Sequence, residues 1–184
     1  PIELKFQSHH VKPALVLVCD VSTSMRNCVE FLLMLVYELQ DQVTRTNSFV
    51  FVSDLKDISM VFNEHEPMTA VERVLTENQP GHYNTDLGNS LNTFKKDYMG
   101  TISSKTTVIL VGDGRNNYNN PRLDIVSDLM RKARRLIWFN PEASGQWGTD
   151  DSDMLAYAPL SHGVFKVSNL RELGAAVDKI LTDG

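Results

Sequence analysis

Cysteine is scarce in this sequence, with two residues among 184. Cys19 lies in a buried apolar run and Cys28 in a predicted helix, and their separation does not match a redox Cys-x-x-Cys pair. The five histidines show no spacing typical of zinc ligands. These absences argue against a zinc site or dithiol chemistry, and we interpret both cysteines as small core residues of a protein in a reducing compartment.

Long apolar runs, basic excess and nucleotide-binding motifs are also missing. No apolar run approaches membrane-spanning length, there is no signal-peptide pattern, and a net charge of −5 argues against a nucleic-acid partner. Neither a phosphate loop of the Gly-Lys-Ser/Thr kind nor Gly-x-Gly-x-x-Gly is present, so ATP hydrolysis would have to come from a partner. A serine hydrolase would need Gly-x-Ser-x-Gly, which is absent too.

What is present is the composition of one globular domain, with 42% hydrophobic and 22% charged residues. The chain begins with Pro1 rather than Met. We therefore expect residues 14–184 to be a domain excised from a longer chain, preceded by a polar lead-in segment over residues 1–13.

Apolar periodicity predicts strands and helices that alternate along the chain. The predicted strands cover residues 15–19, 48–53, 58–62, 106–111, 136–139 and 164–167. The predicted helices cover residues 25–43, 67–76, 87–98, 121–134 and 170–181, with a short helix through Tyr157. The connection 54–57 is too short for a parallel crossover, so the second and third strands should pair antiparallel. This predicts an α/β fold, a doubly wound and mostly parallel six-stranded sheet with one antiparallel edge strand and helices on both faces.

The segment Asp20-Val21-Ser22-Thr23-Ser24 directly follows the first predicted strand. It offers one carboxylate and two hydroxyls, hard oxygen donors that suit Mg²⁺, or Mn²⁺ or Ca²⁺, better than Zn²⁺. In an open α/β sheet this turn lies at the carboxyl end of the strand, where ligands bind. A plainer interpretation is that Ser24 caps the next helix and Asp20 favours its positive end.

Two further segments carry candidate ligands for the same site. Asp113 follows the fourth predicted strand, and Thr85 precedes the helix predicted from residue 87. If the first and fourth strands are neighbours at the centre of the sheet, Asp20 and Asp113 converge at its switch point, with Thr85 beside them. The plainer interpretation does not predict this convergence.

Other polar residues near this edge have simpler explanations. Asp86 is expected to complement the dipole of its helix rather than to orient a metal shell through water. The acidic cluster Asp150, Asp151 and Asp153 is expected to be a solvated loop rather than a second cation site or a partner surface. Trp147 fits either an exposed interaction anchor or a side chain that tucks its long loop onto the body of the domain.

Over about residues 14–181 the sequence resembles a von Willebrand factor type A (VWA) domain. The metal-ion-dependent adhesion site of that family has Asp-x-Ser-x-Ser after the first strand, a Thr before the third helix and an Asp after the fourth strand. These positions are matched in order by Asp20, Ser22, Ser24, Thr85 and Asp113. The resemblance implies a protein-binding module rather than an enzyme. Its hydroxyls coordinate the ion, one or both Asp act through water, and an acidic residue of a partner fills an open position.

Four longer stretches resemble the bacterial CoxE-like branch of this family, at residues 19–24, 49–55, 134–142 and 147–154. This resemblance implies a carboxy-terminal domain of a longer cytoplasmic protein, an adaptor between a MoxR-type AAA+ ATPase and a client metalloenzyme. The sequence departs from the family pattern at two places. Tyr83-Asn84 replaces the usual Gly-Gly before the Thr, and Gly112 replaces the usual Ser or Thr before the Asp.

Two other functions are compatible with the residues. A Mg²⁺-dependent phosphotransferase or phosphatase could use Asp20 as nucleophile, although the haloacid-dehalogenase pattern needs a second Asp where Ser22 stands. A metal-free VWA domain that only packs against its neighbours is compatible with the altered loop at Tyr83-Asn84.

Overall fold

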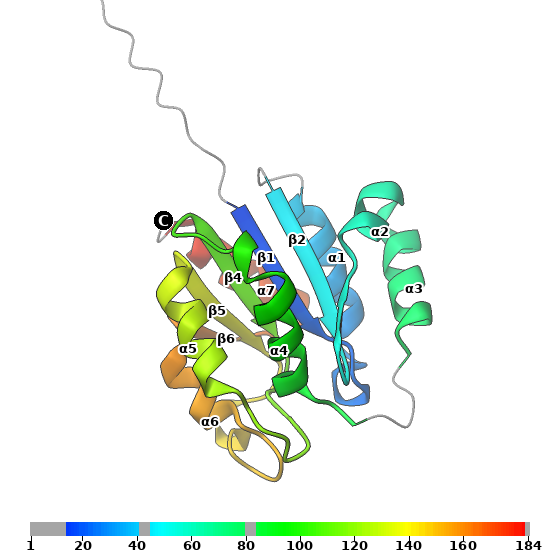
Figure 1. The fold of residues 1–184 in the computed structure, drawn as a ribbon. Coiled ribbons are helices and arrows are strands. Elements are labelled where there is room, and N and C mark those ends of the chain that lie inside the picture. The colour runs from blue at the N-terminus through cyan, green and yellow to red at the C-terminus, as the bar shows by residue number, and fades with distance from the viewer. Residues whose placement is uncertain (1–13, 41–44, 80–83, 183–184) are drawn as a thin grey trace, which may run out of the picture.

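The sheet of the computed structural model contains five parallel strands and one antiparallel edge strand (Figure 1). The structure describes residues 14–40, 45–79 and 84–182, so the predicted lead-in over residues 1–13 lies outside it. The strand order is β3-β2-β1-β4-β5-β6, which confirms that the first and fourth strands are central neighbours. The strands are β1 (Ala14–Asp20), β2 (Arg45–Phe51), β3 (Leu55–Asp57), β4 (Thr106–Val111), β5 (Arg135–Asn140) and β6 (Gly163–Lys166).

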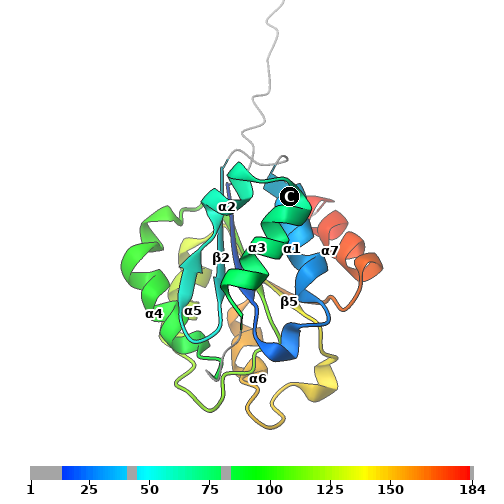
Figure 2. The same ribbon diagram turned by 90° about the vertical axis from the view of Figure 1, so that its right-hand side faces the viewer.

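Helices cover both faces of this sheet (Figure 2). One apolar core lies between the sheet and the helices on each face. One face packs against α1 (Val29–Gln40), α3 (Pro67–Glu77) and α7 (Leu170–Thr182), and the other against α4 (Leu87–Asp97), α5 (Leu123–Lys132) and α6 (Met154–Tyr157). Successive β1 side chains alternate between the two cores, Leu17 entering the first and Val18 the second. The unbroken apolar run in β1 therefore reflects burial on both faces.

The predicted third strand was placed wrongly. An antiparallel strand does follow β2, but it is β3, and residues 58–62 belong largely to helix α2 (Ser59–Glu64). Ile58 and Phe62 are buried, whereas Met60 between them is 64% exposed. Positions i and i+4 share a helical face, so the same apolar residues fit a helix. The Asp57 carboxylate accepts a hydrogen bond from the Ser59 N–H at 2.9 Å, which favours a helix start over strand continuation.

The helix predicted from residue 25 begins later than expected. A short 3₁₀ turn, η1 (Thr23–Met25), comes first, and α1 starts at Val29. The Met25 N–H donates to the carbonyl of Ser22 at 3.1 Å, so the chain curls before the helix begins. The predicted end of this helix, at residues 41–43, lies outside the described residues. The remaining elements occur close to their predicted bounds, and no described helix is long and apolar enough to cross a membrane.

Candidate metal centre

The carboxylates of Asp20 and Asp113 lie at the same end of two adjacent parallel strands. Cys19 pairs with Val111 in the β1–β4 register, so Asp20 and Asp113 both follow closely after the paired residues. Asp20 is 1% exposed and Asp113 is 2% exposed. Gly112 lies against Asp20, since a Cβ atom added there would be 3.1 Å from the Asp20 Cβ. The strand order therefore brings together two buried carboxylates that are far apart in sequence.

The two serines of the motif are held beside Asp20 by the turn that follows β1. The Ser22 N–H donates to Oδ1 of Asp20 at 2.7 Å, and the hydroxyls of Ser22 and Ser24 lie 3.1 Å apart. Because α1 begins only at Val29, Ser24 is not its N-cap, and that part of the plainer interpretation is wrong. The extended backbone of Ser22 leads into η1, which turns both hydroxyls toward the same side.

Thr85 reaches the site from the segment before α4. Together with Ser22 and Ser24 it lines an open depression of about 250 Å³, whose other walls include Asn84 and Arg115. The three predicted hydroxyl ligands thus come from two distant segments and meet in one cavity.

Asp86 caps the helix that follows, as expected. Its carboxylate accepts a hydrogen bond from the Asn89 N–H at 2.8 Å in the first turn of α4, and its own N–H donates to the Val52 carbonyl. This fixes the chain on the carboxyl side of Thr85.

The electrostatics of this edge suit a divalent cation. Burial and the neighbouring charge of Asp113 raise the pKa of Asp20 to about 7, against the opposing effect of its hydrogen bonds from Ser22. A cation placed between these groups would offset both the lost hydration and the repulsion. Two carboxylates and three hydroxyls form the hard oxygen set that Mg²⁺ and Mn²⁺ prefer, so the residues fit such an ion.

The family to which the sequence can be assigned is consistent with the fold described above. The sequence matches the family described as VWA domain containing CoxE-like protein, over residues 1–175. The chain belongs to this family. Among curated proteins, no sequence matches this CoxE-like VWA domain significantly.

Solved structures share the fold at low sequence identity. Proximal thread matrix protein 1 from the mussel byssus has a TM-score of 0.61 and 16% identity, over 92% of this chain and 47% of its own. BatB from Bacteroides thetaiotaomicron has a TM-score of 0.58 and 12% identity, over 93% of this chain and 98% of its own. Manganese-loaded TRAP from Plasmodium vivax has a TM-score of 0.51 and 17% identity, over 82% of this chain and 62% of its own.

Manganese is the metal named for TRAP, and zinc is named for the mussel protein. Another structure of the mussel protein has zinc in its metal-ion-dependent adhesion site, with a TM-score of 0.61 and 15% identity, over 92% of this chain and 47% of its own. The CoxE-like VWA domain therefore spans about half the length of the mussel protein. Identities this low establish a common fold and do not transfer a function.

Arg115 links Asp113 to the loop after β5, a role that the sequence analysis missed. Its N–H donates to Oδ1 of Asp113 at 2.9 Å. Its guanidinium contacts Glu142 at 2.8 Å and Asp151 at 3.1 Å, and these partners raise its pKa further. Asp151 is thus paired with a cation, and the described residues contain no group of three or more His, Cys, Asp or Glu arranged to hold a metal.

Asn116 is a second residue that the sequence analysis did not single out. Its side chain is fully buried, and its carbonyl oxygen accepts the N–H of Leu87 at 2.8 Å. Its amide group donates to the Asn119 carbonyl at 2.9 Å and to the Asp153 carboxylate at 3.2 Å. Asn116 therefore links the Asp113 segment to α4, just after Thr85, and to the loop before α6.

Two side chains of β5 form hydrogen bonds to the backbone at Gly112 and Asp113. The indole N–H of Trp138 donates to the Gly112 carbonyl at 2.8 Å, and the Asn140 amide donates to the Asp113 carbonyl at 3.3 Å. A signal for Asn140 was present in the sequence, because a polar residue at the end of a buried strand needs a buried partner. Trp147 is half-buried against the core that α4, α5 and α6 share, so it tucks its loop onto the domain.

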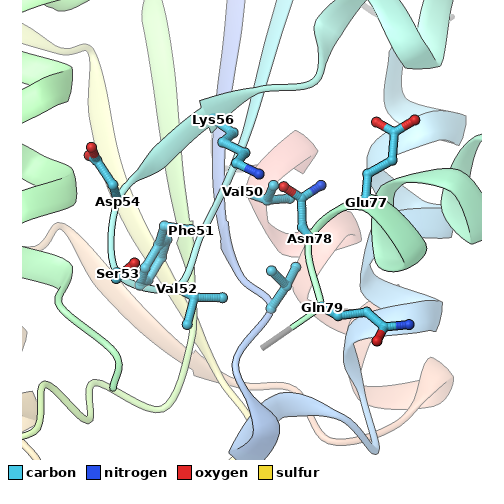
Figure 3. Close-up of a pocket in the computed structure, with 10 residues that line it drawn as sticks. Val50, Phe51, Val52, Ser53, Asp54, Lys56, Glu77, Asn78 and Gln79 are labelled. Atoms are coloured by element: carbon cyan, nitrogen blue, oxygen red, sulfur yellow. The ribbon is translucent and has the colours of Figure 1, made fainter. Parts of the chain in front are cut away.

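A second cavity, of about 230 Å³, lies between the β2–β3 turn and the end of α3 (Figure 3). Its lining includes Val21, which follows Asp20, but none of the five predicted ligands. Figure 3 shows Lys56 and Asn78 facing each other across it. This cavity is therefore distinct from the depression lined by Ser22, Ser24 and Thr85.

Proposed function

We propose that this CoxE-like VWA domain is a metal-dependent binding module without catalytic activity. Asp20, Ser22, Ser24, Thr85 and Asp113 would hold Mg²⁺, or Mn²⁺ or Ca²⁺, directly or through water. An acidic residue of a partner protein would complete the shell. The observation that carries this proposal is the meeting of three hydroxyls in one depression, at the edge where burial and the neighbouring Asp113 raise the free energy of ionised Asp20.

Calorimetric titration with Mg²⁺ and Mn²⁺ tests the metal site. Asp20→Asn keeps the shape of the side chain and an acceptor for the Ser22 N–H, but removes the charge. We expect the binding heat to disappear in this variant and in Asp113→Asn. The matched control is Asp150→Asn, which removes an exposed carboxylate from the loop before α6. Equal affinity in Asp20→Asn and the native chain would contradict the proposed ligand set.

We further propose that the partner is a MoxR-type AAA+ ATPase, or the metalloenzyme on which it acts in the cytoplasm. Membership of the CoxE-like family supports this role. A MoxR-type ATPase should be retained by the immobilised domain in Mg²⁺ and released by EDTA, and Asp113→Asn should retain none. Retention that survives both EDTA and Asp113→Asn would refute metal-dependent capture.

An enzymatic function predicts a different result. A phosphatase that uses Asp20 as nucleophile would hydrolyse para-nitrophenyl phosphate when Mg²⁺ is added, whereas a binding module would not. The position two residues after Asp20, where such enzymes need an acid, holds Ser22.

A further inference from the structure

We infer that Tyr118 forms the second half of the partner-binding surface, so that the partner is a segment carrying an acidic residue next to an apolar side chain. The acidic residue would reach the metal and the apolar side chain would pack on the Tyr118 ring. This inference rests on the proposed function, because it assigns the specificity of the same site.

Tyr118 is exposed and directly follows a residue that lines the depression. Of the five large apolar side chains that are mostly exposed in the described part of the chain, Tyr118 is the most exposed, at 80%. The preceding residue, Asn117, lines the depression together with Ser22, Ser24 and Thr85. The Tyr118 side chain makes no hydrogen bond or ring contact with the described residues. Its ring therefore has no evident role in the fold.

The backbone that presents this ring is strained. Asn117 and Tyr118 both lie in the left-handed region, with φ of 50° and 60°. For a residue with a bulky side chain this conformation is unfavourable, and an aromatic residue has no local hydrogen bond with which to compensate. Gly or Asn would adopt this conformation at a lower energetic cost. Tyr at this position therefore lowers the stability of the folded domain.

Hydrogen bonds on both sides keep the strained turn in place. The Asn117 N–H donates to the Asp151 carboxylate at 3.0 Å. The Asn119 N–H donates to the Asn116 carbonyl at 2.9 Å, and the Asn119 side chain donates to the Thr85 carbonyl at 3.2 Å. The turn that carries Tyr118 is thus bonded directly to the residue that supplies a proposed metal ligand. The backbone that carries Tyr118 is therefore held next to the segment that supplies Thr85.

The chemistry of this surface defines the partner. The metal attracts a carboxylate, while the Tyr118 ring offers an apolar face with a hydroxyl at its tip, a combination that is frequent at the centre of protein interfaces. A purely acidic surface would bind the metal without using the ring. A short segment with an Asp or Glu and a nearby apolar or aromatic residue uses both.

The test uses random peptides displayed on phage, selected on the whole chain in Mg²⁺ and eluted at low pH, so that release by EDTA is measured separately. We expect the enriched peptides to share an acidic residue at a fixed spacing from an apolar residue. Synthetic copies should bind Tyr118→Asn at least about tenfold more weakly than the native chain, and Tyr118→Phe nearly as well. Tyr118→Asn should keep the native Mg²⁺ affinity and unfold at the same or a higher temperature, since Asn tolerates the left-handed backbone.

The control is Met60→Ala, which removes another exposed apolar side chain, in α2 at the opposite end of the domain from α6 (Figure 1). It should leave peptide affinity unchanged. Equal binding to Tyr118→Asn and the native chain overturns the inference, as does a selection that enriches nothing or only acidic residues. Failure of the proposed function gives a different pattern, in which Asp113→Asn binds the peptides normally and EDTA does not release them.

Discussion

The side-chain oxygen of Asn116 accepts the N–H of Leu87 at 2.8 Å, which joins the segment after β4 to the first turn of α4. Leu87 lies two residues after Thr85, and Asn116 lies three residues after Asp113. This buried hydrogen bond therefore sets the distance between two loops that each supply a proposed metal ligand. Leu87 would otherwise have an unpaired donor at the helix terminus.

Asn116→Ala should lower both stability and metal affinity. It leaves the Leu87 N–H and the Asp153 carboxylate without their buried partner, which should reduce the free energy of unfolding by about 3 kcal/mol. Urea denaturation measures this loss, and calorimetry should show weaker Mg²⁺ binding because Thr85 is less firmly placed. The control Asn63→Ala, at an exposed position on α2, should change stability by less than about 0.5 kcal/mol. Native Mg²⁺ affinity in Asn116→Ala would show that the link has no role at the site.

The position of the candidate site was predictable from the sequence, whereas the residues that hold its loops in place were not. Asp20 and Asp113 each follow a buried apolar run, and topology rules alone place such ends side by side. Asn116 and Arg115 hold loops whose paths depend on packing between distant segments, and local patterns do not encode those paths. The α2 error has a related cause, because Ile58 and Phe62 fit either period until tertiary contacts decide between them.

Stability without divalent cations should fall as pH rises. The pKa of Asp20 is raised from 3.8 to about 7, so between these values the folded state binds more protons than the unfolded state. The unfolding free energy therefore decreases with pH across this window and levels off above it. Asp20→Asn should remove this part of the pH dependence, which thermal unfolding of both proteins in EDTA would reveal.

Mg²⁺ should counteract that loss. Because the cation binds the ionised site, the rise in melting temperature on adding Mg²⁺ should be larger at about pH 8 than at about pH 5. The difference should vanish in Asp20→Asn. A Mg²⁺ effect of equal size at both pH values would mean that ionisation of Asp20 is not linked to binding.

Gly88→Ala should destabilise the domain although it improves helix propensity. A Cβ atom at this position in α4 would lie 1.8 Å from the carbonyl oxygen of Asn120, so the loop between β4 and α5 would have to move. Gly174 in α7 provides the matched control, because a Cβ atom there meets nothing within 4 Å. Gly174→Ala should stabilise by about 1 kcal/mol, whereas Gly88→Ala should lower both the unfolding free energy and Mg²⁺ affinity. Similar gains from both substitutions would contradict the close approach.

The two cysteines flank the proposed site and should be protected in the native state. Cys19 is 1% exposed and Cys28 is 5% exposed. Burial raises the pKa of both thiols, that of Cys28 to about 11, so little reactive thiolate forms near neutral pH. We expect a disulfide reagent such as DTNB to titrate both thiols in urea but to react slowly with the folded chain. Rapid modification of either thiol in the folded chain would contradict this burial.

Cys28 should also report on metal binding. Its thiol donates to the Met25 carbonyl at 3.2 Å, at the end of the turn that positions Ser22 and Ser24. Reaction at Cys28 therefore requires this turn to open, and an ion held by the two hydroxyls should slow the opening. Mg²⁺ should lower the rate of Cys28 modification in the native chain, with Cys19 replaced by Ala to isolate the signal. The same rate with and without Mg²⁺ is expected once Asp20→Asn is added, because that variant lacks the charge that holds the ion.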